Sequence, residues 1–370
     1  YWLCAVIANV SYLVIVFSAL SFFTDTPELR LFGDGNTWQS IVGASVLLWV
    51  VHFLVLRGVQ TAAGINLVAT LAKLLPLGAF VALAALAFQL DTFRLDFSGL
   101  ALGVPVWEQV KNTMLITLWV FIGVEGAVVV SARARHKRDV GRATLLAVLS
   151  ALAVYLLVTL LSLGVVPRSE LAEMRNPSMA GLMVRLMGSW GEIVIAAGLI
   201  VSVCGAYLSW TIMAAEVPFL AATHKAFPRL FARQNSNNAP SASLWLTNIS
   251  VQVSLVLIWL TGSDYGTLLT IASEMILVPY LLVGAFLLKI ATRPLHKAVA
   301  IGACIYGIWL LYASGPVHLL LSVVLYAPGL LVFLYARRTH QHDRSLKRRE
   351  VALIGLLLVA AVPATWMLVG

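Results

Sequence analysis

The sequence predicts an all-α polytopic membrane protein, and its composition and charge pattern carry that prediction. Of its 370 residues, 61% are hydrophobic and only 11% are charged, whereas about 25% of the residues of a soluble domain are charged. The mean hydropathy is +0.93, and the charges lie in short stretches between long apolar runs. A bilayer accepts only helices or closed barrels, and these runs lack the alternation of barrel strands. Each run therefore predicts a membrane helix.

A helix of about 20 apolar residues crosses a bilayer, and on that length the chain contains eleven candidate spans. They occupy residues 1–23, 39–56, 64–90, 109–131, 143–166, 191–221, 243–261, 266–289, 298–314, 317–336 and 351–369. The first residue, Tyr1, already lies inside an apolar run without a signal-peptide pattern. We therefore expect the chain to be the remainder of a longer protein.

The first three spans are bounded by charges in the segments that follow them. Residues 1–23 end before Asp25, 39–56 end before Arg57, and 64–90 end before Asp91. The later spans are bounded in the same way by the charged residues Glu108, Arg142, Arg168, Lys225, Lys289, Lys297, Arg337 and Glu350.

The connecting segments alternate between acidic and basic. Segments 24–38 and 91–108 are acidic, whereas 132–142 and 337–350 are strongly basic. The positive-inside rule places the basic loops in the cytoplasm, residue 1 on the cytoplasmic side and the C-terminus outside. The net charge of +9 then reflects topology in a cell inner membrane, and no nucleic-acid partner is expected. Four aromatic residues predict anchors at the outer interface: Trp38, Trp107, Trp190 and Tyr265.

The sequence shows no catalytic or metal-binding motif. Cys4, Cys204 and Cys304 are far apart within apolar segments, which predicts buried thiols instead of disulfides or a metal site. The sequence contains no phosphate loop, no paired nucleophile and base, and no metal-spaced histidine cluster. We expect no enzyme activity and no cofactor.

Ionisable side chains inside spans cost free energy and usually face a cavity or a partner. Glu216 lies near Lys225, so a structural pair is the simpler interpretation. Lys73 lies too deep in its span for its ammonium to reach the membrane interface easily. It is expected to be either a fixed buried cation between helices or a functional charge. Glu274 predicts either a site for a cationic substrate or a proton, or a structural hydrogen bond.

Glu125 lies between two glycines near the middle of the span at 109–131. The glycines weaken the helix and free backbone groups, and interrupted helices at the bilayer midplane are where transporters bind substrates. The alternative is a glycine-mediated helix contact with a neutral, hydrogen-bonded Glu125. Asn9 is a polar residue within the first apolar span. A single residue of this kind more often forms a hydrogen bond between helices than binds a ligand.

The stretch Thr117–Ala127, which includes Trp119 and Glu125, resembles the broken sixth helix of the amino acid/polyamine/organocation transporters. Further similar stretches are Tyr1-Trp2-Leu3 with Asn9, Leu208-Ser209-Trp210-Thr211, Ala226–Arg233 and Leu277-Val278-Pro279-Tyr280. The chain resembles in particular the basic amino acid antiporters, from its start to about residue 290.

This resemblance implies a LeuT-type fold with a five-plus-five inverted repeat, of which the chain holds the third to thirteenth helices. Residues 1–90 would be helices 3–5 of the first repeat, 109–289 the second repeat, and 298–369 accessory helices 11–13. The first two helices, with a glycine-rich break that binds the substrate carboxylate, would be missing. The resemblance also implies a homodimer as a possible assembly.

The resemblance also implies a substrate site built around the broken helix. Trp119 would stack on the substrate, and backbone groups from Trp119 through Ile122 and Gly123 would bind its α-ammonium. Asn9 would lie near the guanidinium or terminal ammonium, and Trp210 beneath the site. An indole attracts a cationic side chain by about 0.5 to 2 kcal/mol.

An inner gate is implied as well, formed by Tyr1, Glu125 and Tyr280, with Glu125 as its pH-sensitive group. Two phenols can hydrogen-bond one buried carboxylate. Departures from the agmatine-exchanging pattern at Tyr12, Ala272 and Glu274 favour ornithine or lysine as a substrate.

Together these observations predict an antiporter that exchanges arginine for ornithine or a related cation by alternating access. One alternative is a proton-coupled permease for lysine that uses Glu274 or Lys73 as its proton site. The other is an inactive truncated fragment.

Overall fold

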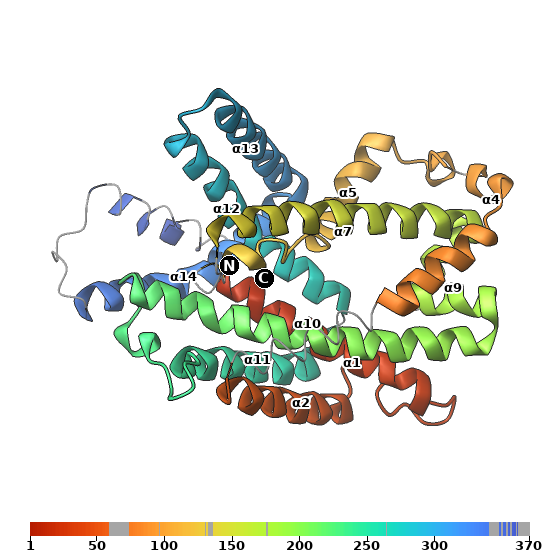
Figure 1. Ribbon diagram of the computed structural model, residues 1–370, viewed down its shortest axis with the longest axis horizontal. Coiled ribbons are helices and arrows are strands. Elements are labelled where there is room, and N and C mark those ends of the chain that lie inside the picture. Colours follow the sequence, from red (N-terminus) through yellow and green to blue (C-terminus); the bar gives the residue numbers. More distant parts are fainter. Residues whose placement is uncertain are drawn as a thin grey trace.

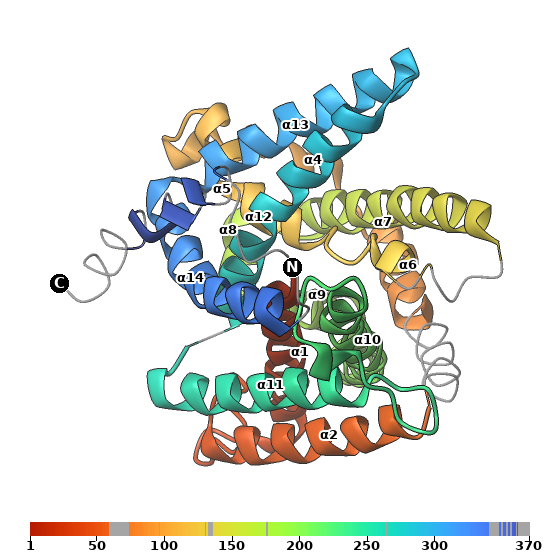
Figure 2. The same cartoon turned by 90° about the vertical axis from the view of Figure 1, so that its left-hand side faces the viewer.

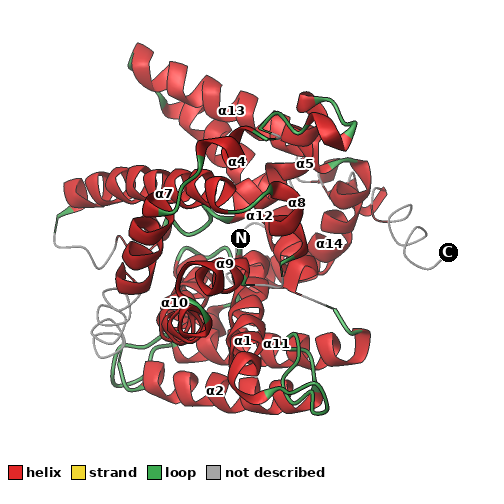
Figure 3. Ribbon diagram, turned by 90° about the vertical axis from the view of Figure 1, so that its right-hand side faces the viewer, coloured by secondary structure: helices red, strands yellow, loops and turns green. Residues whose placement is uncertain are grey.

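The computed structural model describes residues 1–58, 74–95, 97–129, 131, 136–174, 177–263, 265–339, 348 and parts of 351–361. Every regular element in that part of the chain is a helix (Figure 3). Seven of these helices are long and apolar enough to cross a membrane, which confirms the predicted fold class. They are α1 (Trp2–Thr24), α2 (Trp38–Leu56), α7 (Lys137–Val165), α10 (Ser189–Thr223), α11 (Ser241–Thr261), α12 (Tyr265–Ile290) and α13 (Pro294–Ser314).

The other four expected spans lie outside this set of seven helices. The span at 317–336 corresponds to α14 (Pro316–Thr339), and most of 351–369 lies outside the described residues. The span at 109–131 is divided into α5 (Val106–Trp119) and α6 (Gly126–Val129). The shorter elements are α4 (Leu90–Arg94), η1 (Leu100–Leu102), α8 (Arg168–Glu173), α9 (Ser178–Met187) and η3 (Arg229–Ala232).

The span expected at about 64–90 is described only from residue 74, and its helix ends a few residues earlier, at Leu86. The helix at Leu74–Leu86 stops before Gln89. The N–H of Gln89 donates to the carbonyl of Gly164 in α7 at 2.9 Å, and the ring of Phe88 fills the space beside Gly164. Contact with α7 therefore replaces the last turn of the helix.

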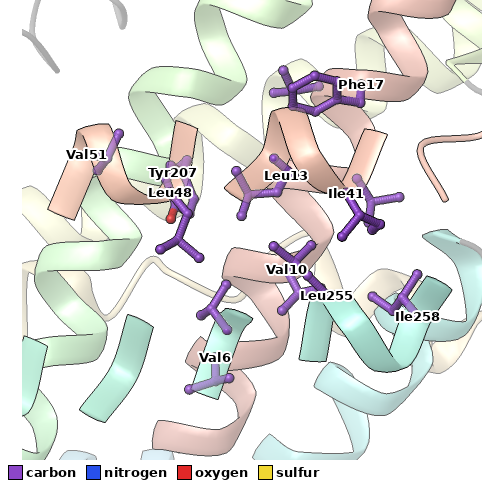
Figure 4. Packing of buried hydrophobic residues seen from close by; sticks show 14 of the residues in the cluster. Val6, Val10, Leu13, Phe17, Ile41, Leu48, Val51, Tyr207, Leu255 and Ile258 are labelled. Carbon is purple, nitrogen blue, oxygen red and sulfur yellow. The ribbon is translucent and has the colours of Figure 1, made fainter. Parts of the chain in front are cut away.

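Helix α1 lies at the centre of the molecule and α7 at its edge. In the apolar window of α1, 78% of the residues are buried, whereas none is buried in that of α7. A helix that is hydrophobic on all sides is stable only where other elements surround it, and α2, α10, α11 and α12 all contact α1 (Figure 1). Figure 4 shows Val10 and Leu13 of α1 among Leu48 of α2, Tyr207 of α10 and Leu255 of α11.

Helices α2 and α11 lie side by side (Figure 2) and are joined by polar side chains. Nδ2 of Asn248 lies 2.8 Å from Nδ1 of His52, and both residues are fully buried. The indole of Trp49 donates to Oε1 of Gln252 at 3.2 Å, and Nε2 of Gln252 donates to Oγ of Ser45 at 2.8 Å. These bonds join the two helices beside the apolar cluster around α1.

The segment after α1 is organised by one carboxylate. Asp25 accepts the backbone N–H groups of Phe32 at 3.0 Å and Gly33 at 2.7 Å, and these bonds fix the loop that returns the chain to α2. Burial alone would raise the pKa of Asp25, but the hydrogen bonds outweigh it and hold the pKa below its usual value.

Candidate substrate site and gate

The site is centred on the break between α5 and α6, where the sequence predicts an interrupted helix. After Trp119 the chain leaves the helix for six residues, 120–125, and becomes helical again at Gly126. Gly123 has φ +107°, and a Cβ there would lie 3.0 Å from Cζ2 of Trp210. Both the backbone conformation and the close approach of the indole therefore require glycine at residue 123.

The carboxylate of Glu125 joins three segments of the chain. The hydroxyl of Tyr1 donates to Oε1 at 2.9 Å, and the hydroxyl of Tyr280 donates to Oε2 at 3.1 Å. The N–H of Gly123 donates to Oε2 at 2.9 Å. Both oxygens thus act as acceptors, as an ionised carboxylate does. The structure brings together the three predicted gate residues, one from the start of α1, one from the break and one from α12.

Two indoles lie next to the break. Trp119 and Ile122 pack, as Tyr12 of α1 does, against a buried cluster that includes Ala5 and Trp210, the latter 7% exposed. The ring centroids of Tyr12 and Trp210 are 6.2 Å apart. The predicted substrate residues Trp119, Ile122, Gly123 and Trp210 therefore meet in one place.

Asn9 belongs to the same face of α1. It lies four residues after Ala5 and three before Tyr12, a spacing that places the three residues on one side of a helix. Its side chain is fully buried, and neither its Oδ1 nor its Nδ2 has a hydrogen-bond partner among the residues that the structure describes. Because an unpaired buried amide costs about 1 to 3 kcal/mol, this position favours a polar ligand over a purely structural role.

The other predicted charges lie in different surroundings. Glu274 is 3% exposed in α12, between Ser273, whose hydroxyl donates to the carbonyl of Leu115 at 3.1 Å, and Met275, which packs with Cys4. Glu216 is also 3% exposed, in α10. Lys73 lies outside the described residues.

Two tyrosines that sequence reasoning did not assign contact the site. Tyr155 of α7 donates its hydroxyl to the carbonyl of Val120 at 2.7 Å, so it binds a backbone group that the break has freed. The side chain of Tyr265 lies beside that of Trp119 and is partly buried. Trp38, Trp107 and Trp190 are 58% to 70% exposed, and interface anchoring by these residues and by Tyr265 stays a prediction. A lone phenol within the apolar run of α7 was the available signal for Tyr155.

A large groove of about 920 Å³ lies elsewhere, between α2 and α11. Its lining includes the apolar side chains of Trp49, Phe53 and Trp259. The site residues belong to α1, the break, α10 and α12, so this groove does not compete with the break as the place for a cationic substrate.

Comparison with known proteins gives one consistent family. The family model described as amino acid permease matches residues 1–357. A protein of Escherichia coli (strain K12), provisionally named an arginine/ornithine antiporter, is 88% identical over 370 residues, which is all of this chain and 80% of the relative. The arginine/ornithine antiporter of Pseudomonas aeruginosa is 43% identical, covering 91% of this chain and 73% of that protein.

A relative with another printed substrate pair is similar over the same length. The arginine/agmatine antiporter of Chlamydia caviae is 38% identical, covering 99% of this chain and 78% of its own. The family match, the identity to these antiporters and the helical membrane fold agree with one another. The chain therefore belongs to the amino acid permease family, within the amino acid/polyamine/organocation transporters, and is a multi-pass membrane transporter.

Proposed function

We propose that the protein exchanges arginine for ornithine across the cytoplasmic membrane by alternating access. The observation that carries the proposal is the broken helix, where two indoles and an unpartnered amide adjoin a carboxylate held by two phenols. The printed names of the relatives support the substrate class, because three of them are arginine antiporters.

Each side chain of the site has a separate role in binding. The guanidinium or terminal ammonium lies against the face of an indole, which attracts a cation by about 0.5 to 2 kcal/mol. Oδ1 of Asn9 accepts a hydrogen bond from the same cationic group. The carbonyl of Trp119 already accepts the N–H of Ile122 at 3.1 Å, and its second lone pair is available to the α-ammonium.

The contacts of Glu125 with Tyr1 and Tyr280 act as the inner gate. While these hydrogen bonds hold, the start of α1, the break and α12 stay together on one side of the site. If the basic loops are cytoplasmic, this side faces the cytoplasm. Release of substrate inward then requires both phenols to leave the carboxylate. The inverted repeat and the homodimer stay predictions of the family resemblance.

Counterflow in proteoliposomes containing the full-length protein tests the exchange. Uptake of radiolabelled arginine should depend on ornithine inside the vesicles, and Trp119→Leu should weaken it by raising the KM for arginine. Trp190→Leu is the matched control because Trp190 is 70% exposed. Equal uptake by ornithine-free vesicles would argue against exchange, and accumulation driven by a pH gradient alone would favour a proton-coupled permease.

A further inference from the structure

Helix α12 carries a proline immediately before the gate residue Tyr280. Pro279 lies inside the helix and has no N–H, so the carbonyl of Met275, four residues earlier, loses its helical partner. The hydroxyl of Tyr326, in α14, donates to this carbonyl at 2.7 Å. A side chain from another helix thus replaces the bond that the proline removes.

At a second internal proline, a side chain from another helix also replaces the missing backbone hydrogen bond. Pro218 lies inside α10, and the carbonyl that it leaves without a helical partner is that of Ala214. The hydroxyl of Thr247 in α11 donates to this carbonyl at 3.4 Å and accepts the indole N–H of Trp2 at 3.1 Å. The bond from Tyr326 is shorter, and it lies within five residues of Tyr280.

The surroundings of the Met275 carbonyl make its partner important. Met275 and Cys4 are fully buried, and they form one apolar cluster against which Tyr1, Tyr280 and Tyr326 pack. Water does not reach such a cluster freely, so a carbonyl that loses its partner there bears the cost of an unpaired polar group. Helix α12 can reduce that cost by changing its bend, which would move Tyr280, or by admitting water to the cluster.

We infer that Tyr326 is a positioning residue of the inner gate: its hydroxyl holds α12 in the conformation in which Tyr280 reaches Glu125. This inference rests on the proposed role of the Glu125 contacts as a gate. It assigns a function in transport to α14, a helix that contributes none of the predicted site residues. Tyr326 touches neither the substrate nor Glu125 in this role, and acts through α12.

The native thiol of Cys4 reports on the gate independently of transport. Cys4 lies within one helical turn of Tyr1 and is fully buried, so a maleimide reaches it only when the gate side opens. Cys204 and Cys304 are partly exposed and would be replaced by alanine in the parent protein. Tyr326→Phe should then raise the rate of Cys4 alkylation by N-ethylmaleimide roughly 2- to 10-fold, the range expected for loss of one hydrogen bond. Tyr335→Phe, on the exposed side of the same helix, should leave the rate unchanged.

A change at Pro279 separates positioning from general packing. Pro279→Ala restores an N–H for the Met275 carbonyl, so the added change Tyr326→Phe should no longer raise the alkylation rate. An equal increase with and without Pro279, or no increase in either background, would overturn the inference. Arginine exchange by the unmodified protein is measured separately, so failure of the proposed function is distinguishable from failure of this contact.

Discussion

At the scale of single residues, Asn9 is the clearest case of a side chain kept in a costly position. Within the described part of the chain its amide is fully buried and has no hydrogen-bond partner, between the apolar residues Ala8 and Val10. Such a group carries a penalty of about 1 to 3 kcal/mol. Bound arginine or ornithine offers compensation for that penalty, because either brings N–H donors to the carbonyl oxygen of the amide.

Asn9→Leu should therefore affect binding and stability in opposite directions. Loss of the hydrogen bond should raise the KM for arginine about 10-fold, which corresponds to about 1.4 kcal/mol. The substrate-free protein should unfold at an equal or higher temperature, because an unpaired amide is replaced by an apolar side chain. Asn112→Leu on the exposed face of α5 serves as the control. A lower unfolding temperature with unchanged KM would assign Asn9 to packing alone.

Sequence reasoning was most successful at residues that belong to a compact pattern. Glu125 between two glycines indicates a break, and the family resemblance supplied Tyr1 and Tyr280 as its partners, which the structure places within hydrogen-bonding distance. Tyr155 and Tyr326 were not predicted as contributors, because their hydroxyls act across helix contacts. The direction of such a side chain follows from packing of the whole chain and not from local sequence.

At the scale of elements, flanking charges predicted most helix ends to within a few residues, whereas breaks inside apolar runs were harder to place. Hydropathy does not distinguish a helical residue from an apolar residue in a turn, so the stop at Leu86 was invisible in the sequence. The break at 120–125 was predictable because glycines stand on both sides of the charged residue Glu125. Each glycine lowers helix stability by about 1 kcal/mol.

The break itself should be intolerant of a side chain at residue 123. Gly123→Ala forces φ +107° on a residue with a Cβ and places that atom 3.0 Å from Trp210. The combined strain should cost roughly 1 to 3 kcal/mol and move Trp210, lowering both the unfolding temperature and the rate of arginine exchange. Gly141→Ala in α7, where a Cβ has open space, is the control. Normal exchange by the Gly123 variant would show that the break adopts another conformation during transport.

At the scale of the whole molecule, the candidate site lies where α1, the break and α10 meet. A ligand bound there contacts three segments that are far apart in the sequence, and it stabilises the folded state by mass action. The central position of α1, 78% of whose apolar window is buried, means that this stabilisation reaches most of the transmembrane core.

Arginine should consequently raise the thermal unfolding temperature of the detergent-solubilised protein. At a concentration 100 times the Kd, the expected stabilisation is about 2.7 kcal/mol. Ornithine should act similarly, and leucine, which has no cationic side chain, should have little effect. Trp119→Leu should reduce the shift caused by arginine. A shift of the same size with leucine would contradict a site selective for cations.

The polar contacts between α2 and α11 have a consequence for how the chain is made. His52 and Asn248 are separated by 196 residues, and at about 5 to 20 residues per second a ribosome needs roughly 10 to 40 s to synthesise that interval. During this time α2 has been synthesised, but Asn248 and Gln252, the partners of His52 and Trp49, have not. The buried pairing between these helices therefore forms only after α11 has been synthesised, and membrane insertion of α2 precedes its final packing.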